Sequence, residues 1–239
     1  MSESVYAPGF YQDRRANTAH AARQVLGIVM GLLEPKTIAD VGCGTGTWLA
    51  AGLALGAERA QGIEGDWVTP EMLDDPAIAF IAHDLEQSFS LTEPVDLAMS
   101  LEVAEHLTPE RAEGFVAELT ASAPAVLFGA AIPGQGGVNH LNEQWQSSWA
   151  AHFARAGYHA YDCVRPAIWG DRSIPPWYRQ NIVLYLHPDH EAATGLIETT
   201  DLARLDLVHP ELWARANREL AYAGALPESE YLALQAAAK

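Results

Sequence analysis

Cysteines and long apolar stretches are scarce in this chain of 239 residues. Its two cysteines, Cys43 and Cys163, lie far apart in the sequence, so they give neither a disulfide framework nor a cysteine metal motif. No apolar run approaches the length of a membrane span, and the N-terminal region has no basic segment followed by an apolar run and a small-residue cleavage site. We therefore expect a cytoplasmic protein that is neither exported nor inserted into a membrane.

Basic residues are also few. Lysine and arginine together number 14 against 31 aspartates and glutamates, the formal net charge is −17, and no basic cluster stands out. An acidic surface of this kind repels polyanions, which makes nucleic acid and anionic membranes poor partners. We therefore expect a small molecule rather than a nucleic acid as the substrate.

Apolar β-like runs alternate with helical segments along the chain, as a largely parallel sheet requires. A helix is expected over residues 14–33, and further helices after Gly46, Thr108 and Asn142. Thr108 is placed to cap its helix, because Pro109 takes the first helical position. The expected strands lie near residues 37–41, 59–63, 79–83, 95–101, 125–132, 159–164 and 181–187.

The sequence divides into three parts of one folding unit, since an α/β fold of this length commonly forms one domain. Residues 1–36 form an N-terminal helical or lid segment, residues 37–190 form the core with the sheet, and residues 191–239 form a C-terminal helical extension. Apolar residues recur at helical spacing in this extension. It serves either as a helical cap or as the contact of a homo-oligomer.

A glycine-rich turn follows the first expected strand. Residues 38–46 read Ile-Ala-Asp-Val-Gly-Cys-Gly-Thr-Gly, and Gly42, Gly44 and Gly46 lack β-carbons, so a ligand can lie against bare backbone amides. Glu64 follows the next strand, where an acidic side chain can accept hydrogen bonds from ribose hydroxyls. A dinucleotide site would read G-x-G-x-x-G/A, whereas this turn reads G-x-G-x-G, which favours a nucleoside without phosphates.

The Asp-Val-Gly-Cys-Gly-Thr-Gly string and its spacing to Glu64 resemble motif I of the class I S-adenosylmethionine-dependent methyltransferases. The resemblance implies an α/β Rossmann-like fold with a mostly parallel seven-stranded sheet flanked by helices, and S-adenosylmethionine as the cofactor. In this family an N-terminal segment can fold over the cofactor, which makes Tyr11 a candidate lid residue. The other implied cofactor-binding residues are Asp40, Gly42, Cys43, Gly44 and Gly46 at the methionine part, Glu64 at the ribose with the adjacent Gly65 and Asp66, Asp84 and Leu85 at the adenine, and Ser100 and Leu101 at the end of the fourth strand.

A second cluster follows the fourth expected strand. Glu102, Glu105 and His106 put two carboxylates and an imidazole in a five-residue window, and such ligands suit magnesium, manganese or a related divalent ion. The E-x-x-E-H string resembles the metal-binding motif of small-RNA 2′-O-methyltransferases and ubiquinone-pathway O-methyltransferases. In the RNA enzymes a further histidine follows the fifth strand, and His140 occupies the comparable place here. The resemblance thus implies a metal site of Glu102, Glu105, His106 and His140.

His106 and His140 also have possible roles that need no metal. His106 and His140 are candidate catalytic general bases, because an unperturbed imidazole titrates near neutral pH. Alternatively, they pack as structural histidines beside the cofactor.

These features together predict an enzyme that transfers a methyl group from S-adenosylmethionine to a small molecule, with a hydroxyl beside another oxygen, as on a sugar, as the favoured acceptor. Several alternatives stay open. A metal-free enzyme would methylate nitrogen or a carboxylate, and a non-catalytic protein would bind the cofactor alone. The E-x-x-E-H motif suggests an RNA methyltransferase, which the acidic charge opposes, and the glycine spacing disfavours a nicotinamide-dependent dehydrogenase.

Overall fold

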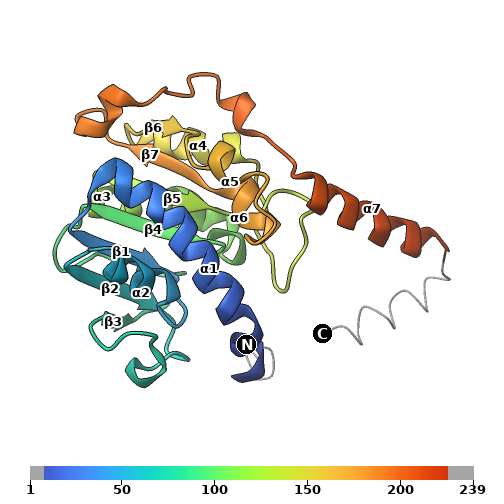
Figure 1. The fold of residues 1–239 in the computed structure, drawn as a ribbon. Coiled ribbons are helices and arrows are strands. Elements are labelled where there is room, and N and C mark those ends of the chain that lie inside the picture. The colour runs from blue at the N-terminus through green and yellow to red at the C-terminus, as the bar shows by residue number, and fades with distance from the viewer. Residues whose placement is uncertain (1–7, 226–239) are drawn as a thin grey trace.

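The computed structural model describes residues 8–225 and, within them, the side chains of residues 17–218. In this part of the chain, seven strands form one sheet in the order β3-β2-β1-β4-β5-β7-β6 (Figure 1). They are β1 Thr37–Val41, β2 Arg59–Glu64, β3 Ala79–Ala82, β4 Leu97–Leu101, β5 Ala125–Gly129, β6 His159–Tyr161 and β7 Val183–Leu186. The strands from β3 to β5 pair in parallel, and β7 lies antiparallel between β5 and β6. The mostly parallel seven-stranded sheet expected from the sequence is confirmed.

Helices flank this sheet (Figure 1). The α-helices are α1 Pro8–Leu33, α2 Thr47–Ala54, α3 Ala112–Ser122, α4 Gln146–Arg155, α5 Arg165–Ile168, α6 Pro176–Asn181 and α7 Pro210–Ala225. Short 3₁₀ turns are η1 Pro70–Met72, η2 Ala104–His106, η3 Pro109–Arg111, η4 Glu191–Gly195 and η5 Leu202–Leu205. No helix within the described range is both long and apolar enough to cross a lipid bilayer.

The core consists of two apolar layers, one on each face of the sheet. Leu26 of α1 and Leu49 of α2 belong to one layer, and Phe115 of α3 with Trp149 and Phe153 of α4 belongs to the other. Every residue of β4 and β5 is buried. Central parallel strands covered on both faces have continuous apolar sequences, which explains why the sequence predicted these strands so clearly.

Several predicted boundaries differ from the structure: α1 begins six residues earlier than expected, and β4, β6 and β7 are shorter than the expected strands over residues 95–101, 159–164 and 181–187. Two further differences have a visible physical reason. The strand expected over residues 125–132 ends at Gly129, because the chain leaves the sheet there to form the glycine-rich loop that follows. The expected helix start after Thr108 is a 3₁₀ turn, Pro109–Arg111, before α3. The Thr108 hydroxyl donates to the Glu86 carboxylate at 2.9 Å and makes no cap, so a tertiary hydrogen bond replaces the predicted local one.

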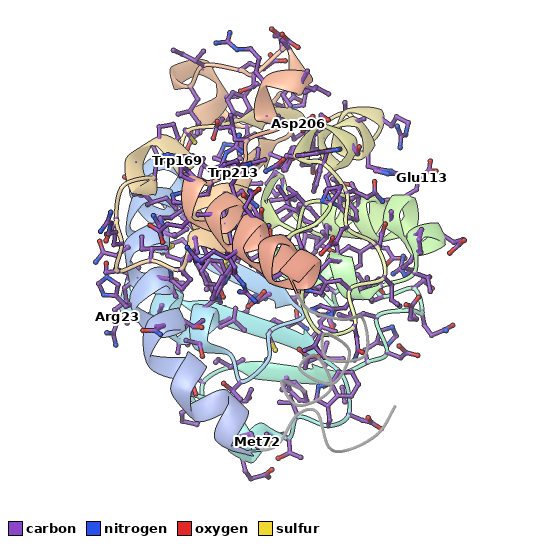
Figure 2. The ribbon with its side chains drawn as sticks, turned by 90° about the vertical axis from the view of Figure 1, so that its right-hand side faces the viewer. Arg23, Met72, Glu113, Trp169, Asp206 and Trp213 are labelled. Carbon is purple, nitrogen blue, oxygen red and sulfur yellow. The ribbon has the colours of Figure 1, made fainter. Side chains whose placement is uncertain are left out.

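The chain after β7 is joined to the core by buried arginines before α7 projects from the body (Figure 1). Arg165 Nη1 donates to the Leu205 carbonyl at 2.8 Å, and Arg179 Nη2 donates to Glu211 at 3.0 Å. The Ser147 hydroxyl donates to Asp206 at 2.8 Å. Figure 2 faces this junction, where Trp169, Asp206 and Trp213 are labelled. Residues 226–239 of the predicted extension lie outside the described residues.

Gly62 of β2 offers a test of the packing beneath the glycine-rich turn. A β-carbon at this position would lie 2.6 Å from Cys43 Sγ and 3.1 Å from Leu49 Cδ1. We expect Gly62→Ala to lower the free energy of unfolding by about 1–3 kcal/mol, since overpacking a dense core forces its neighbours apart. Urea denaturation measures this change.

Gly27→Ala is the matched control, because an added β-carbon on this exposed position of α1 meets nothing within 4 Å. It should be neutral or stabilising by up to about 1 kcal/mol, as alanine favours a helix over glycine. Equal destabilisation by both changes would contradict this description of the core.

Candidate active site

The turn between β1 and α2 takes a backbone shape that requires glycine. Gly42, Gly44 and Gly46 have φ angles of +87°, +52° and +77°. Space is limited as well, because a β-carbon on Gly42 would lie 2.3 Å from Val103 Cγ2, and one on Gly46 would lie 2.7 Å from Ile78 Cδ1. Side chains other than hydrogen would therefore strain this turn at two positions for two independent reasons.

Glu64 at the end of β2 holds this turn through its carboxylate. Oε2 accepts a hydrogen bond from the Gly44 N–H at 2.9 Å, and Oε1 accepts one from the Gly65 N–H at 2.8 Å. Burial raises the pKa of Glu64, while these two backbone donors act in the opposite direction. A carboxylate has about four lone-pair sites, so Glu64 keeps acceptor capacity for further donors such as hydroxyls.

Asp40 lies beside Glu64 in the interior and is only 2% exposed. Burial, followed by the charge of Glu64, raises the pKa of Asp40 to about 8. The carboxyl group is therefore largely neutral at pH 7 in the protein without ligand. A cationic group placed next to it would favour the ionised form.

Other residues predicted to bind the cofactor occupy different positions around this turn. Asp84 is exposed just beyond β3, and Leu85 is buried next to it. The His83 N–H donates to the Glu64 carbonyl at 2.8 Å, which brings the Asp84 segment to the end of β2. Asp66 is exposed. Asp40, the glycine turn, Glu64 and the Asp84 segment thus meet at the carboxyl ends of adjacent parallel strands, where ligands of open α/β sheets bind.

Four of the predicted cofactor-binding residues do not present a side chain to this turn in the described part of the structure. The fully buried Ser100 hydroxyl donates to the Val41 carbonyl at 2.9 Å and so joins β4 to β1. The Cys43 thiol packs toward Gly62, and burial raises its pKa, so this residue presents only its backbone to the turn. Tyr11 falls in α1, but its side chain lies outside the described residues. Leu101 is buried at the end of β4.

An aromatic residue that the sequence analysis missed covers Gly65. A β-carbon on Gly65 would lie 2.2 Å from the Trp67 indole ring, which is half exposed. Trp67 thus presents a flat face next to the residue that Glu64 holds. Its place two residues after Gly65 gave no separate signal in the sequence.

The second predicted cluster begins with a strained residue at the end of β4. Glu102 has a φ angle of +59°, which is uncommon for a residue with a side chain. Its carboxylate accepts from Asn181 Nδ2 at 2.8 Å and from Gln135 Nε2 at 3.2 Å. Burial raises the pKa of Glu102, and these amide donors oppose the rise. Strained residues of this kind concentrate at functional sites.

Glu105, His106 and His140 come together next to Glu102. One potential ligand atom from each of the three lies within 4.8 Å of the others, and the two imidazole rings meet edge to face with centroids 4.9 Å apart. Glu105 is 1% exposed, and neither of its oxygens has a hydrogen-bond partner of standard geometry among the described residues, although the Glu102 carboxyl and the backbone amides of Glu105 and Ala131 lie close enough to affect its pKa. Burial and the charge of Glu102 raise the pKa of Glu105. Of the four predicted metal ligands, the structure groups these three and directs Glu102 toward the amides of Asn181 and Gln135.

Gln135 and Asn181 are site residues that sequence reasoning missed. Gln135 Oε1 accepts from Gln180 Nε2 at 2.9 Å and from Asn181 Nδ2 at 3.1 Å, so the loop after β5 is joined to α6. Glu102 and Asn181 are separated by 79 positions in the sequence. No local pattern reveals a contact of this range.

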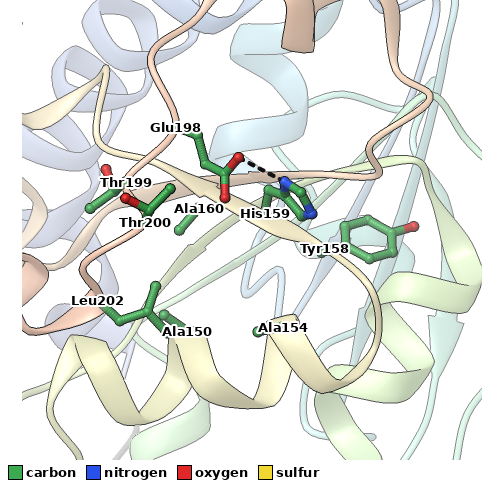
Figure 3. Close-up of a pocket in the computed structure, with 9 residues that line it drawn as sticks. All are labelled: Ala150, Ala154, Tyr158, His159, Ala160, Glu198, Thr199, Thr200 and Leu202. Atoms are coloured by element: carbon green, nitrogen blue, oxygen red, sulfur yellow. Dashed lines mark ion pairs between the residues drawn. The ribbon is translucent and has the colours of Figure 1, made fainter.

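A pocket of about 190 Å³ lies away from both clusters, between α4, β6 and residues 198–202 (Figure 3). His159 Nδ1 and Glu198 Oε2 form an ion pair of 3.0 Å in its wall. Strands β4, β5 and β7 separate β6 from β1 in the sheet. None of the residues that line this pocket belongs to either cluster.

Neither a protein-family model nor a curated protein matches this chain. Solved structures are similar to it in fold. DesVI of Streptomyces venezuelae matches with a TM-score of 0.56 and 16% identity over 78% of this chain and 98% of DesVI. The magnesium protoporphyrin IX methyltransferase ChlM of Synechocystis PCC 6803, with bound S-adenosylmethionine, matches with a TM-score of 0.53 and 16% identity over 76% of this chain and 85% of ChlM.

The mitomycin 7-O-methyltransferase MmcR matches with a TM-score of 0.51 and 14% identity over 71% of this chain, which spans 54% of the length of MmcR. Identities this low are informative about the fold alone. The chain therefore has the Rossmann-like methyltransferase fold.

The raised pKa of Asp40 predicts a pH-dependent stability. The folded protein retains a proton up to about pH 8 that the unfolded chain loses above its ordinary pKa of 3.8, so this contribution to stability is complete below pH 3.8 and lost as the pH rises toward 8. Between pH 5 and 8, this group should remove up to about 1.4 kcal/mol of unfolding free energy per pH unit. Urea denaturation across this range measures the slope.

Asp40→Asn should flatten this dependence, because asparagine has no proton to lose. Comparing the two slopes isolates Asp40 from other groups that titrate over the same range. Identical slopes would show that Asp40 is already ionised in the folded protein at neutral pH.

Proposed function

We propose that this protein transfers the methyl group of S-adenosylmethionine to a hydroxyl oxygen of a small molecule. The observation that carries the proposal is the Glu64 carboxylate, which bridges the Gly44 and Gly65 amides at the carboxyl ends of β1 and β2. The fold supports it, since ChlM binds S-adenosylmethionine on the same fold. The acidic surface, with a formal charge of −17, favours a small molecule over RNA.

Each part of the cofactor has a chemically suitable counterpart in this site. Glu64 would accept hydrogen bonds from the ribose hydroxyls, with Trp67 beside it. Asp84 and the apolar Leu85 would meet the adenine. The glycine turn and Asp40 would face the methionine part, whose ammonium and sulfonium charges favour the ionised form of a buried carboxyl.

The cofactor supplies an electrophilic methyl group on a positively charged sulfur. The protein must hold the acceptor oxygen in line with the bond from sulfur to this methyl carbon, and such alignment contributes on the order of 7–11 kcal/mol in favourable cases. As the carbon–oxygen bond forms and the carbon–sulfur bond breaks, the hydroxyl proton needs a base. In a reaction without a metal, His140 or His106 would take it at a ring nitrogen.

The residues after β4 also fit a divalent cation. Two imidazoles and the carboxylate of Glu105 converge, and the Glu105 oxygens are buried without partners of standard geometry in the described part of the chain. A buried carboxylate is costly unless it is paired, and the neighbouring Glu102 carboxyl and two backbone amides offer no positive charge, so a cation bound here would stabilise this group. Glu105, His106 and His140 would hold magnesium or manganese, with Glu102 adjacent. Such an ion lowers the pKa of a bound hydroxyl, which favours an acceptor that offers two neighbouring oxygens.

A metal-free reaction is the second candidate, and one contact favours it. His140 Nδ1 lies 2.8 Å from the Glu143 carboxylate, an arrangement that orients an imidazole as a general base. A metal-free reaction is compatible with nitrogen and carboxylate acceptors as well as with hydroxyls.

Calorimetric titration with S-adenosylhomocysteine tests the cofactor site. Glu64→Gln should weaken binding roughly tenfold to a hundredfold, because hydrogen bonds to a charged group contribute about 1.5–3 kcal/mol. Glu58→Gln is the matched control. The Glu58 side chain, just before β2, is 72% exposed, so this variant should leave the affinity unchanged.

Transfer of a labelled methyl group from the cofactor to a panel of hydroxyl acceptors then tests the reaction. Tight binding of NAD without binding of S-adenosylhomocysteine would overturn the proposal.

Electron paramagnetic resonance of bound manganese, with S-adenosylhomocysteine present, tests the cation. We expect site-specific binding that both Glu105→Gln and His140→Ala weaken at least tenfold, since each removes one converging ligand. Excess chelator should then suppress methyl transfer to acceptors with neighbouring oxygens. Undiminished transfer in chelator would instead assign His106 and His140 to the metal-free reaction.

A further inference from the structure

Glu143 lies outside the groups assigned to the cofactor and the cation, yet its carboxylate contacts three groups of the loop formed by residues 133–140. Oε2 accepts a hydrogen bond from the Gly134 N–H at 2.7 Å, and Oε1 accepts one from the Gly136 N–H at 2.9 Å. Oε1 also lies 2.8 Å from His140 Nδ1. The Glu143 side chain is mostly buried. One carboxylate therefore joins the backbone of the loop to a candidate catalytic histidine.

The backbone of this loop depends on those contacts. Gly134 and Gly136 have φ angles of +81° and +69°, in the left-handed region that favours glycine. Neither residue belongs to a helix or strand, so regular secondary structure does not bind their amides. The Glu143 carboxylate accepts hydrogen bonds from both amides at once, which holds the backbone between Gly134 and Gly136 in this conformation.

The same carboxylate sets the protonation pattern of the His140 ring. An ionised carboxylate only accepts hydrogen bonds, so Nδ1 must carry the hydrogen. In the neutral imidazole, the lone pair then lies on Nε2, which becomes the atom able to accept a proton or bind a cation. Packing limits the ring as well, because a β-carbon on Gly137 would lie 2.1 Å from Nε2.

We propose that Glu143 is a positioning residue of the methyl-transfer site, a role that rests on the function proposed above. It holds the 133–140 loop and presents His140 with a lone pair on Nε2. Gly137 completes the arrangement by leaving room for the ring. The reaction thus depends on a residue that touches neither cofactor nor acceptor and acts through His140.

Glu143→Gln tests this role, because the amide keeps the size of the side chain and removes the charge that fixes the tautomer. We expect kcat to fall about 10- to 100-fold, the range for residues that orient a ligand or base, with little change in KM for S-adenosylmethionine. Glu110→Gln, on an exposed position before α3, is the matched control and should leave kcat unchanged. Binding of S-adenosylhomocysteine shows that each variant is folded.

Nitrogen-15 spectra of the histidine rings supply a readout that requires no methyl transfer. In full-length protein treated with chelator, the His140 signal, assigned with His140→Ala, should show hydrogen on Nδ1, and Glu143→Gln should shift it toward the Nε2-protonated form. Amide exchange at Gly134 and Gly136 should accelerate in the same variant. These readouts test Glu143 even when no acceptor is methylated, so failure of the proposed function is recognised separately.

Gly137→Ala distinguishes the effect of the His140 ring position from the effect of the loop conformation. It should lower kcat by displacing His140 while amide exchange at Gly134 and Gly136 stays slow, because their contacts with Glu143 remain. Wild-type His140 with its hydrogen on Nε2 would overturn the proposal, and so would an unchanged kcat in folded Glu143→Gln.

Discussion

The hydrogen bonds of Glu64 to Gly44 and Gly65 connect the parts of the fold on which the candidate site depends. They tie the glycine turn after β1 to the end of β2, and the Glu64 carbonyl receives the His83 N–H that brings in the chain after β3. Three loops from three parallel strands are thereby held at one edge of the sheet. Because the donors are backbone amides, the arrangement depends on glycine conformations rather than on further side chains.

Buried acidity is the second constraint. Asp40, Glu64, Glu102 and Glu105 all have raised pKa values, with burial as the first cause in each case. Burying carboxyl groups without cations is unfavourable for the folded chain on its own. The large buried cations of the C-terminal junction do not relieve them, since Arg165 pairs with Asp162 and Arg179 pairs with Glu211. A positively charged ligand bound here would favour the ionised carboxylates, and its binding should release protons.

The sequence predicted the features that are encoded locally. The Asp40–Gly46 string specifies a turn with its own conformational requirement, and the buried strands appear as continuous apolar runs. Glu105 and His106 are adjacent in the sequence, and His140 was placed with them through the order of strands in the resembling family. In contrast, the contacts of Glu102 with Asn181 and of Thr108 with Glu86 depend on tertiary structure. Glu143 was missed because its partners, two backbone amides and a ring nitrogen, have no signature in residue type.

The left-handed backbone of Glu102 sets a conformational cost against two side-chain hydrogen bonds. A non-glycine residue at a φ angle of +59° costs about 1–2 kcal/mol relative to a relaxed backbone. Glycine would remove that cost and would also remove the carboxylate that receives the Asn181 and Gln135 amides. Leaving those amide donors without the carboxylate costs about 1–3 kcal/mol, which offsets the gain from a relaxed backbone. Laboratory evolution of a more heat-resistant chain should accordingly hold position 102 fixed and seek its gains elsewhere.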